Sequence, residues 1–137
     1  PYLVDSIINS DGSLFEKPKR AEGKHIDVSQ QTIDYIRMGM SATTQEGGTA
    51  SYFAGLPKLI AGKTGTAENS HGRDHGLFVA YGPVDDPELV VVCIVEQGGF
   101  GSVAAGPIVY KAFEEFFQEK GYMPRPDKAA PKKDTIQ

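Results

Sequence analysis

The chain contains Leu59-Ile60-Ala61-Gly62-Lys63-Thr64-Gly65-Thr66-Ala67, an apolar run that ends in an ammonium, a glycine and two hydroxyls. The apolar half predicts a strand, and successive side chains of a strand point to opposite faces. We therefore expect Thr64 and Thr66 to share one face, and Lys63 and Gly65 to share the other. An extended peptide bound along such a strand gains main-chain hydrogen bonds, and the hydroxyls and the ammonium suit its terminal carboxylate.

The sequence around this run predicts two further strands, over residues 76–82 and 88–97, after a first strand over 58–68. Between the last two lies Pro83-Val84-Asp85-Asp86-Pro87, a turn signal that predicts an antiparallel hairpin. The third strand is nearly all β-branched, so we expect burial on both of its faces, as in a sheet covered by helices.

Helices are predicted on both sides of these strands. One runs from about residue 30 to about 45 and is capped by Asp27 or Ser29, and a second begins at Ser102 and ends at Gly121. Residues 47–57 predict a packed loop that is too rich in glycine for regular structure. At the start of the chain, residues 2–8 and 13–16 predict a hairpin, and residues 122–137 predict a mobile charged tail.

Composition limits the class of protein. With 137 residues and 39% apolar residues, the chain is long enough for one soluble globular domain. A net charge of −4 gives no basic surface for nucleic acid, and no stretch approaches the roughly 20 apolar residues of a membrane span. The lone Cys93 lies within an apolar strand and is expected to pack as a small apolar residue. Because the chain begins without Met and in strand-like sequence, we expect it to be a piece of a longer protein.

Several short motifs occur in a fixed order along the chain. Gly48-Thr49-Ala50 precedes the run that ends in Lys63-Thr64-Gly65-Thr66, and Arg73-Asp74-His75 leads into the second strand. The acidic turn, Glu96-Gln97-Gly98-Gly99 and the last helix follow. In these features residues 1–121 resemble the C-terminal part of the transpeptidase domain of class B penicillin-binding proteins. The Arg-Asp-His run favours the elongation type over the division type.

This resemblance implies an α+β fold of the penicilloyl-serine transferase kind, with an antiparallel sheet flanked by helices. It also implies a parent enzyme that cross-links peptidoglycan: a serine attacks the D-Ala-D-Ala end of a stem peptide, and β-lactams trap that serine. The resemblance also assigns the role of the wall that binds the substrate carboxylate to Lys63, Thr64, Gly65 and Thr66. The parent would be anchored in the bacterial cytoplasmic membrane, with this domain outside the cytoplasm, and would work beside a membrane glycan polymerase.

One part of the family pattern is missing. None of the eight serines has Lys three positions on or Asn two positions on, so the chain carries neither Ser-x-x-Lys nor Ser-x-Asn. We expect the nucleophile in an upstream part of the same domain, and we expect this chain alone to be inactive. Two other functions remain open, namely a non-catalytic penicillin-binding or sensor module and a serine β-lactamase.

A polar loop after the motif offers other chemistry. His71, Asp74 and His75, with Glu68 nearby, have the residue types of a metal site, but the loop composition argues against the helical spacing that would bring them together. We expect no metal there and place Asp74 and His75 at the rim of the cleft.

Two further patterns can be read near that loop. Ser70, His71 and Asp74 have the types of a hydrolase triad but crowd into one loop, whereas triad members converge on a rigid base. Gly98-Gly99-Phe100-Gly101 lacks the lysine of a phosphate-binding loop, so we expect a hinge that permits close packing and no cofactor.

Overall fold

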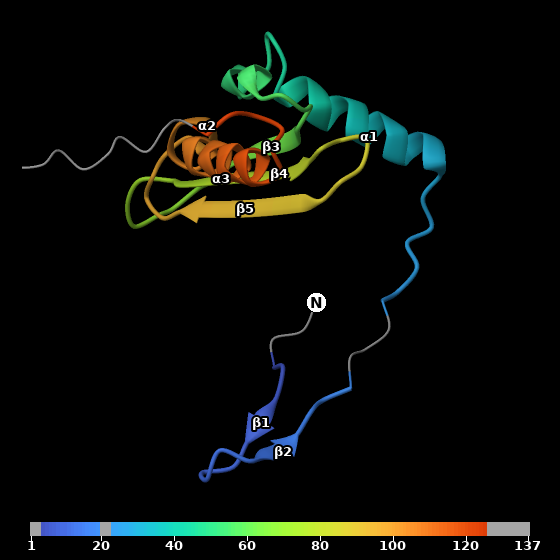
Figure 1. The fold of residues 1–137 in the computed structure, drawn as a ribbon. Coiled ribbons are helices and arrows are strands. Elements are labelled where there is room, and N and C mark those ends of the chain that lie inside the picture. Colours follow the sequence, from blue (N-terminus) through green and yellow to red (C-terminus); the bar gives the residue numbers. More distant parts are fainter. Residues whose placement is uncertain (1–3, 20–22, 126–137) are drawn as a thin grey trace, which may run out of the picture.

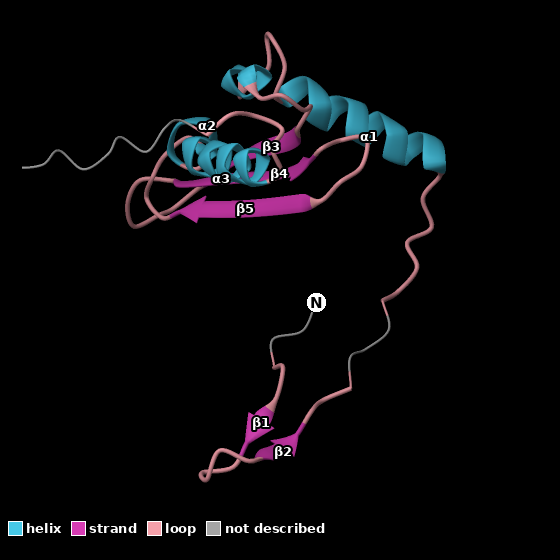
Figure 2. Cartoon of the chain, in the orientation of Figure 1, coloured by secondary structure: helices cyan, strands magenta, loops and turns pink. Residues whose placement is uncertain are grey.

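The body of the structure is a three-stranded antiparallel sheet with helices against it (Figure 1). The computed structural model describes residues 4–19 and 23–125. In chain order the elements are β1 (Ile7–Ile8), β2 (Leu14–Glu16), α1 (Gln30–Thr43), the 3-10 helix η1 (Ser51–Gly55), β3 (Ala61–Ala67), β4 (His75–Gly82), β5 (Leu89–Val95), α2 (Gly101–Ala104) and α3 (Gly106–Glu119). This arrangement confirms the predicted α+β class, in which helices and antiparallel strands are segregated along the chain (Figure 2).

The three predicted strands form the sheet in the order β3-β4-β5. Lys63 lies opposite Val79, Thr64 opposite Phe78 and Thr66 opposite Gly76. Residues directly opposite each other in an antiparallel pair project to the same face, so Thr64 and Thr66 share the face of buried Phe78. Lys63 and Gly65 share the other face, as predicted.

One face of the sheet carries the core. Phe78 stacks on Phe53 of η1 with ring centroids 5.4 Å apart, and Phe53 meets Tyr110 of α3 edge to face at the same distance. Phe113 and Phe117 of α3 are fully buried. The segment over residues 47–57 is therefore packed, as predicted, but its regular 3-10 turn contradicts the expectation of irregular structure, because Phe53 and Leu56 anchor it to the core.

The expectation that β5 is buried on both faces is wrong. Its side chains alternate, and Val90, Val92 and Ile94 are 59–66% exposed. The other face, which includes half-buried Cys93, packs on the core beneath α3. β-Branched residues suit a pleated strand whether one face or both are covered, so composition alone did not distinguish the two cases.

The last helix also differs from its prediction. Phe100 and not Ser102 precedes the first turn, and the helix breaks at Ala105 into α2 and α3. Pro107 has no N–H to donate to the Val103 carbonyl, which interrupts a continuous helical ladder. Gly121, with φ +73°, ends α3 as predicted.

The first helix agrees closely with its prediction. The Ser29 hydroxyl accepts a hydrogen bond from the Thr32 N–H at 3.1 Å and thus caps α1, which ends at Thr43. Beyond it, the buried Thr44 hydroxyl donates to the Ile60 carbonyl, which ties the end of this helix to the start of β3. No helix in the described part of the chain has the length and hydrophobicity that a membrane crossing requires.

The two ends of the described chain differ from their predictions. The N-terminal hairpin pairs Ile7–Ile8 with Leu14–Glu16, and both strands are exposed (Figure 1). Among the described residues its first strand is shorter than the predicted 2–8, and residues 2 and 3 of that prediction lie outside the described part of the chain. At the other end, the Tyr122 hydroxyl donates to Glu88 at 3.1 Å and Met123 packs against the core. The rest of the predicted tail, from residue 126, lies outside the described residues, so the boundary after residue 121 stays a prediction.

The start of α2 sits directly on the central strands. A Cβ at Gly101 would lie 2.0 Å from the Leu77 carbonyl oxygen of β4 and 2.4 Å from that of Gly65 in β3. Only a residue without a side chain can come this close to two backbone oxygens. Close packing at this turn, as predicted, therefore positions α2 against the strand that carries the motif.

Replacing Gly101 by alanine should lower the free energy of unfolding by about 2 kcal/mol or more, because the new methyl must displace backbone. Gly39→Ala is the matched control: it lies inside α1 with open space around its Cβ position, and it should stabilise the chain by about 0.5–1 kcal/mol. Urea denaturation of both variants measures these changes, and equal midpoints would contradict the close packing.

Candidate functional site

The predicted carboxylate-binding run lies on an edge of the sheet. Within residues 4–19 and 23–125, β3 pairs only with β4, which leaves its other edge open to an extended ligand. Lys63 is exposed, and its ammonium donates to the Thr64 carbonyl of its own strand. The Thr64 hydroxyl lies 3.5 Å from that of Thr49, which belongs to the Gly48-Thr49-Ala50 segment. The motif therefore combines a cation, hydroxyls and open backbone.

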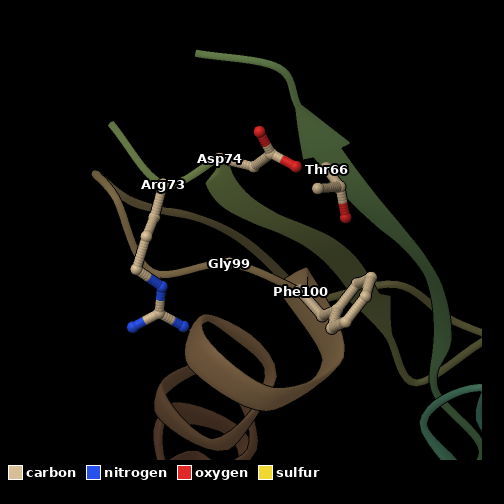
Figure 3. Close-up of a pocket in the computed structure, with 5 residues that line it drawn as sticks. All are labelled: Thr66, Arg73, Asp74, Gly99 and Phe100. Atoms are coloured by element: carbon tan, nitrogen blue, oxygen red, sulfur yellow. The ribbon is translucent and has the colours of Figure 1, made fainter. Parts of the chain in front are cut away.

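A cavity of about 310 Å³ opens at the end of this strand (Figure 3). Thr66 of β3 lines it together with Arg73 and Asp74 from the β3–β4 loop and Gly99 and Phe100 from the β5–α2 turn. In Figure 3 the Asp74 carboxylate points toward Thr66, whereas the Arg73 side chain points away from both. The Phe100 ring is 72% exposed beside them. One wall of the cavity is thus the last hydroxyl of the motif, and the other is a charged and aromatic rim.

All three residues of the Arg-Asp-His run lie against the β5–α2 turn, and two of them accept hydrogen bonds from it. The Gly99 N–H donates to the Asp74 carbonyl at 2.8 Å, and the Gln97 N–H donates to Nδ1 of His75 at 3.0 Å. The Arg73 guanidinium covers Gly99, with Nη2 3.0 Å from where a Cβ would stand, and Gly99 adopts φ +81°. Because Nδ1 of His75 accepts, the proton of the neutral ring is on Nε2.

Asp74 and His75, both predicted at the cleft rim, thus have different positions. Asp74 lines the cavity, and His75 lies outside its lining and holds the turn that forms one wall. Lys63 and Thr64 do not line the cavity, and of the motif only Thr66 does. Strand β3 therefore connects Lys63 and Thr64 to the cavity at its end.

The alternative chemistry that was weighed for the polar loop is not assembled in the described residues. The described residues contain no group of three or more His, Cys, Asp or Glu side chains that could hold a metal ion. Ser70 and His71 are hydrogen bonded at 2.9 Å, but both are exposed neighbours in one loop. Asp74 Oδ1 accepts from the Asn69 N–H at 3.4 Å and does not orient His71, so the third member of a triad is not in place.

Sequence reasoning missed three residues of the cavity, namely Arg73, Gly99 and Phe100. The Arg-Asp-His run and the glycine-rich turn were both noted, but nothing in their spacing shows that two segments more than 20 residues apart pack together. The usable signal was Phe100, a large apolar residue inside a turn of glycines, where packing rarely requires one.

Comparisons with known proteins agree on one family. The family model of the penicillin binding protein transpeptidase domain matches residues 1–114. The peptidoglycan D,D-transpeptidase MrdA of Salmonella typhimurium is 26% identical over 149 residues, which cover 94% of this chain and 23% of that protein. The chain therefore spans about a quarter of the length of that relative.

Solved structures show the same likeness. Pseudomonas aeruginosa PBP2, in complex with WCK 5153, superposes with a TM-score of 0.66 at 31% identity, over 88% of this chain and 27% of that one. Penicillin-binding protein A of M. tuberculosis, as an imipenem acyl-enzyme complex, gives 0.57 at 29% identity, over 86% of this chain and 26% of that one.

Replacing His75 by alanine should free the β5–α2 turn, because the Gln97 N–H loses its acceptor at a cost of about 1 kcal/mol. Hydrogen exchange at the Gln97 amide, followed by NMR, should accelerate about fivefold or more. His75→Asn is the control, since its Oδ1 is placed to accept the same hydrogen bond and should restore protection. If alanine leaves the Gln97 amide as protected as before, His75 does not hold this turn.

Proposed function

Because the chain belongs to the penicillin-binding protein transpeptidase family, we propose that it is a C-terminal segment of an elongation-type peptidoglycan D,D-transpeptidase. Its role is to supply the wall that binds the carboxylate of the stem peptide. The observation that carries this proposal is the open edge of β3, whose Thr66 lines a cavity at the end of the Lys63-Thr64-Gly65-Thr66 run. MrdA, the relative named above, is itself a peptidoglycan D,D-transpeptidase.

The stem peptide would lie along the open edge of β3 as an added strand. Its main chain would bond to the free N–H and C=O groups of this strand, and Gly65 leaves room for close approach. The terminal carboxylate would accept hydrogen bonds from the Thr64 and Thr66 hydroxyls. Among the described residues the Lys63 ammonium donates to a backbone carbonyl, that of Thr64, so an incoming carboxylate offers it a stronger, charge-assisted partner.

In the reaction of the parent enzyme, the serine Oγ attacks the carbonyl of the penultimate D-Ala, and terminal D-Ala leaves with the transferred proton. The amine of a second stem then attacks the ester, which forms the cross-linking amide and returns the serine. The contribution of this chain is to hold the donor peptide and to offer the Thr66 backbone N–H to the developing oxyanion. The imipenem acyl-enzyme of the M. tuberculosis protein supports the same covalent step with β-lactams.

The missing partner is the preceding part of the same domain. Val90, Val92 and Ile94 present an exposed apolar face on β5, which suits a covering element. We propose that this part covers that face and supplies the serine. We propose also that the parent is anchored in the cytoplasmic membrane, with this domain outside the cytoplasm, beside a glycan polymerase.

The chain alone should not react with penicillin. Since none of its serines stands in Ser-x-x-Lys, incubation with a fluorescent penicillin should give no labelled band on a denaturing gel. The full-length protein should give such a band and release D-Ala from a stem peptide. A labelled band from the chain alone would refute the assignment of the nucleophile, and labelling of the full-length protein without D-Ala release would indicate the sensor function instead.

In the full-length protein, Lys63→Ala and Thr66→Val should each slow acylation by penicillin about 10- to 100-fold, as expected for loss of one hydrogen bond to a carboxylate. The second-order rate of labelling is the measurement. Lys111→Ala provides the control, because this lysine is exposed on α3 and forms an ion pair with Glu114 on the same helix. Equal labelling rates for all three variants would show that Lys63 and Thr66 do not bind the carboxylate.

A further inference from the structure

The first turn of α2 forms part of the site at the end of β3. Phe100 stands directly before this helix and lines the cavity, and Gly101 lies against the Gly65 carbonyl of β3 (Figure 3). With four residues, α2 is far shorter than the roughly 12 residues that a helix needs to be stable by itself. The position of this part of the site therefore depends on the contacts that α2 makes with other elements.

One of these contacts comes from Tyr52 of η1. Its hydroxyl donates to the Ser102 carbonyl of α2 at 2.8 Å. The same hydroxyl lies at the break between α2 and α3, where a Cβ at Gly106 would come within 1.9 Å of its oxygen. Gly106 therefore leaves the space that the hydroxyl occupies.

The ring of Tyr52 is packed against core residues. Its centroid lies 5.2 Å from that of Phe53 and 6.1 Å from that of Tyr110. Phe53 is buried and stacks on Phe78 of the central strand. Burial raises the pKa of the Tyr52 hydroxyl above its ordinary value, so the group stays protonated and donates at neutral pH. Tyr52 is thus a hydrogen-bond donor on a rigid base.

The segment that carries Tyr52 also contacts the motif. The Thr49 hydroxyl lies 3.5 Å from that of Thr64 in β3. Between Thr49 and Tyr52, Ala50 is buried, and its N–H donates to the Thr43 carbonyl at the end of α1 at 2.9 Å. One fixed segment therefore reaches the motif through Thr49 and α2 through Tyr52, and it relates the position of α2 to that of β3.

We propose that Tyr52 is a positioning residue of the transpeptidase, whose hydroxyl holds α2 where Phe100 and Gly101 complete the site beside β3. Tyr52 is not among the residues that line the cavity, and it acts through the Ser102 carbonyl. The inference rests on the proposed function and adds to it a residue outside the carboxylate wall. Molecules bind substrate when α2 is in place, so the apparent affinity falls with the fraction of molecules in that state. Substrate that has bound then reacts at its usual rate.

Tyr52→Phe tests this role in the full-length protein, because it removes the hydroxyl and keeps the ring. For release of D-Ala from a peptide that ends in D-Ala-D-Ala, KM should rise about three- to fivefold, as expected for loss of one hydrogen bond, while kcat changes less than about twofold. A contact that merely stabilises the fold leaves KM and kcat of the folded protein unchanged, and a residue that acts on the reacting atoms lowers kcat.

Tyr35→Phe is the matched control. It also removes one hydroxyl from a tyrosine, but this residue is exposed on α1, where its hydroxyl accepts from Gln31 of the same helix. Both kinetic constants should stay as they are in the unaltered enzyme. An unchanged KM in Tyr52→Phe, or a loss confined to kcat, would overturn the proposal.

A second variant displaces the hydroxyl and keeps the tyrosine. Gly106→Ala places a methyl where the Tyr52 oxygen lies, so it should raise KM about as much as Tyr52→Phe does. When both changes are combined, the methyl has no hydroxyl to displace, and KM should rise little beyond the value for Tyr52→Phe alone. Effects that multiply in the double variant would mean that the two residues act independently, which contradicts the proposal.

Hydrogen exchange measures whether α2 itself is released. The Ala104 and Ala105 amides donate to the carbonyls of Phe100 and Gly101. In Tyr52→Phe their exchange should accelerate about fivefold, as measured by mass spectrometry of a peptide that spans α2, and in Tyr35→Phe it should not change. Equal exchange in the unaltered protein and in Tyr52→Phe would overturn the proposal even if KM had risen.

These outcomes distinguish the positioning role from the proposed function. If the full-length protein neither labels with penicillin nor releases D-Ala, the proposed function has failed, and the positioning role fails with it. If the protein does both and Tyr52→Phe leaves KM unchanged, the positioning role alone has failed and the proposed function stands.

Discussion

The candidate site depends on the contact of Gly101 with the carbonyl oxygens of Leu77 and Gly65, where no side chain has room. This contact seats the first turn of α2 on both β3 and β4. As a result, Phe100, which precedes that turn, stands beside Thr66 at the end of the motif strand. Two hydrogen bonds from the β5–α2 turn to Asp74 and His75 then fix the rest of the wall. The cavity therefore depends mainly on the close packing of Gly101 against the strands, and the two hydrogen bonds then fix the turn.

This arrangement explains what the Arg-Asp-His run does in the structure. Its three residues act on the same turn through different atoms: a guanidinium over Gly99, a backbone carbonyl, and a ring nitrogen. The backbone role of Asp74 leaves its carboxylate available to the cavity. One short run of sequence thus serves both to position the wall and to give it charge.

Much of the fold followed from local patterns in the sequence. The strands β3 to β5, the helix capped by Ser29 and the antiparallel turn between prolines are local features, set by alternation, capping and turn chemistry. The errors concern what lies against an element. β5 was expected to be covered on both faces, and the last helix was expected to run unbroken through Ala105, because the run of β-branched residues and the apolar face of the helix do not report their neighbours.

The sequence by itself determined the family and the motif, since Lys63-Thr64-Gly65-Thr66 and the order of elements after it are readable without coordinates. It also determined that no serine of the chain has the family's spacing to lysine. Only the tertiary structure decided that Thr66 meets Arg73, Asp74 and Phe100 in one cavity. The reason is physical. Alternation along a strand is a property of neighbouring residues, whereas a distant turn can approach the strand only where packing leaves room, as it does at Gly101, which has no side chain.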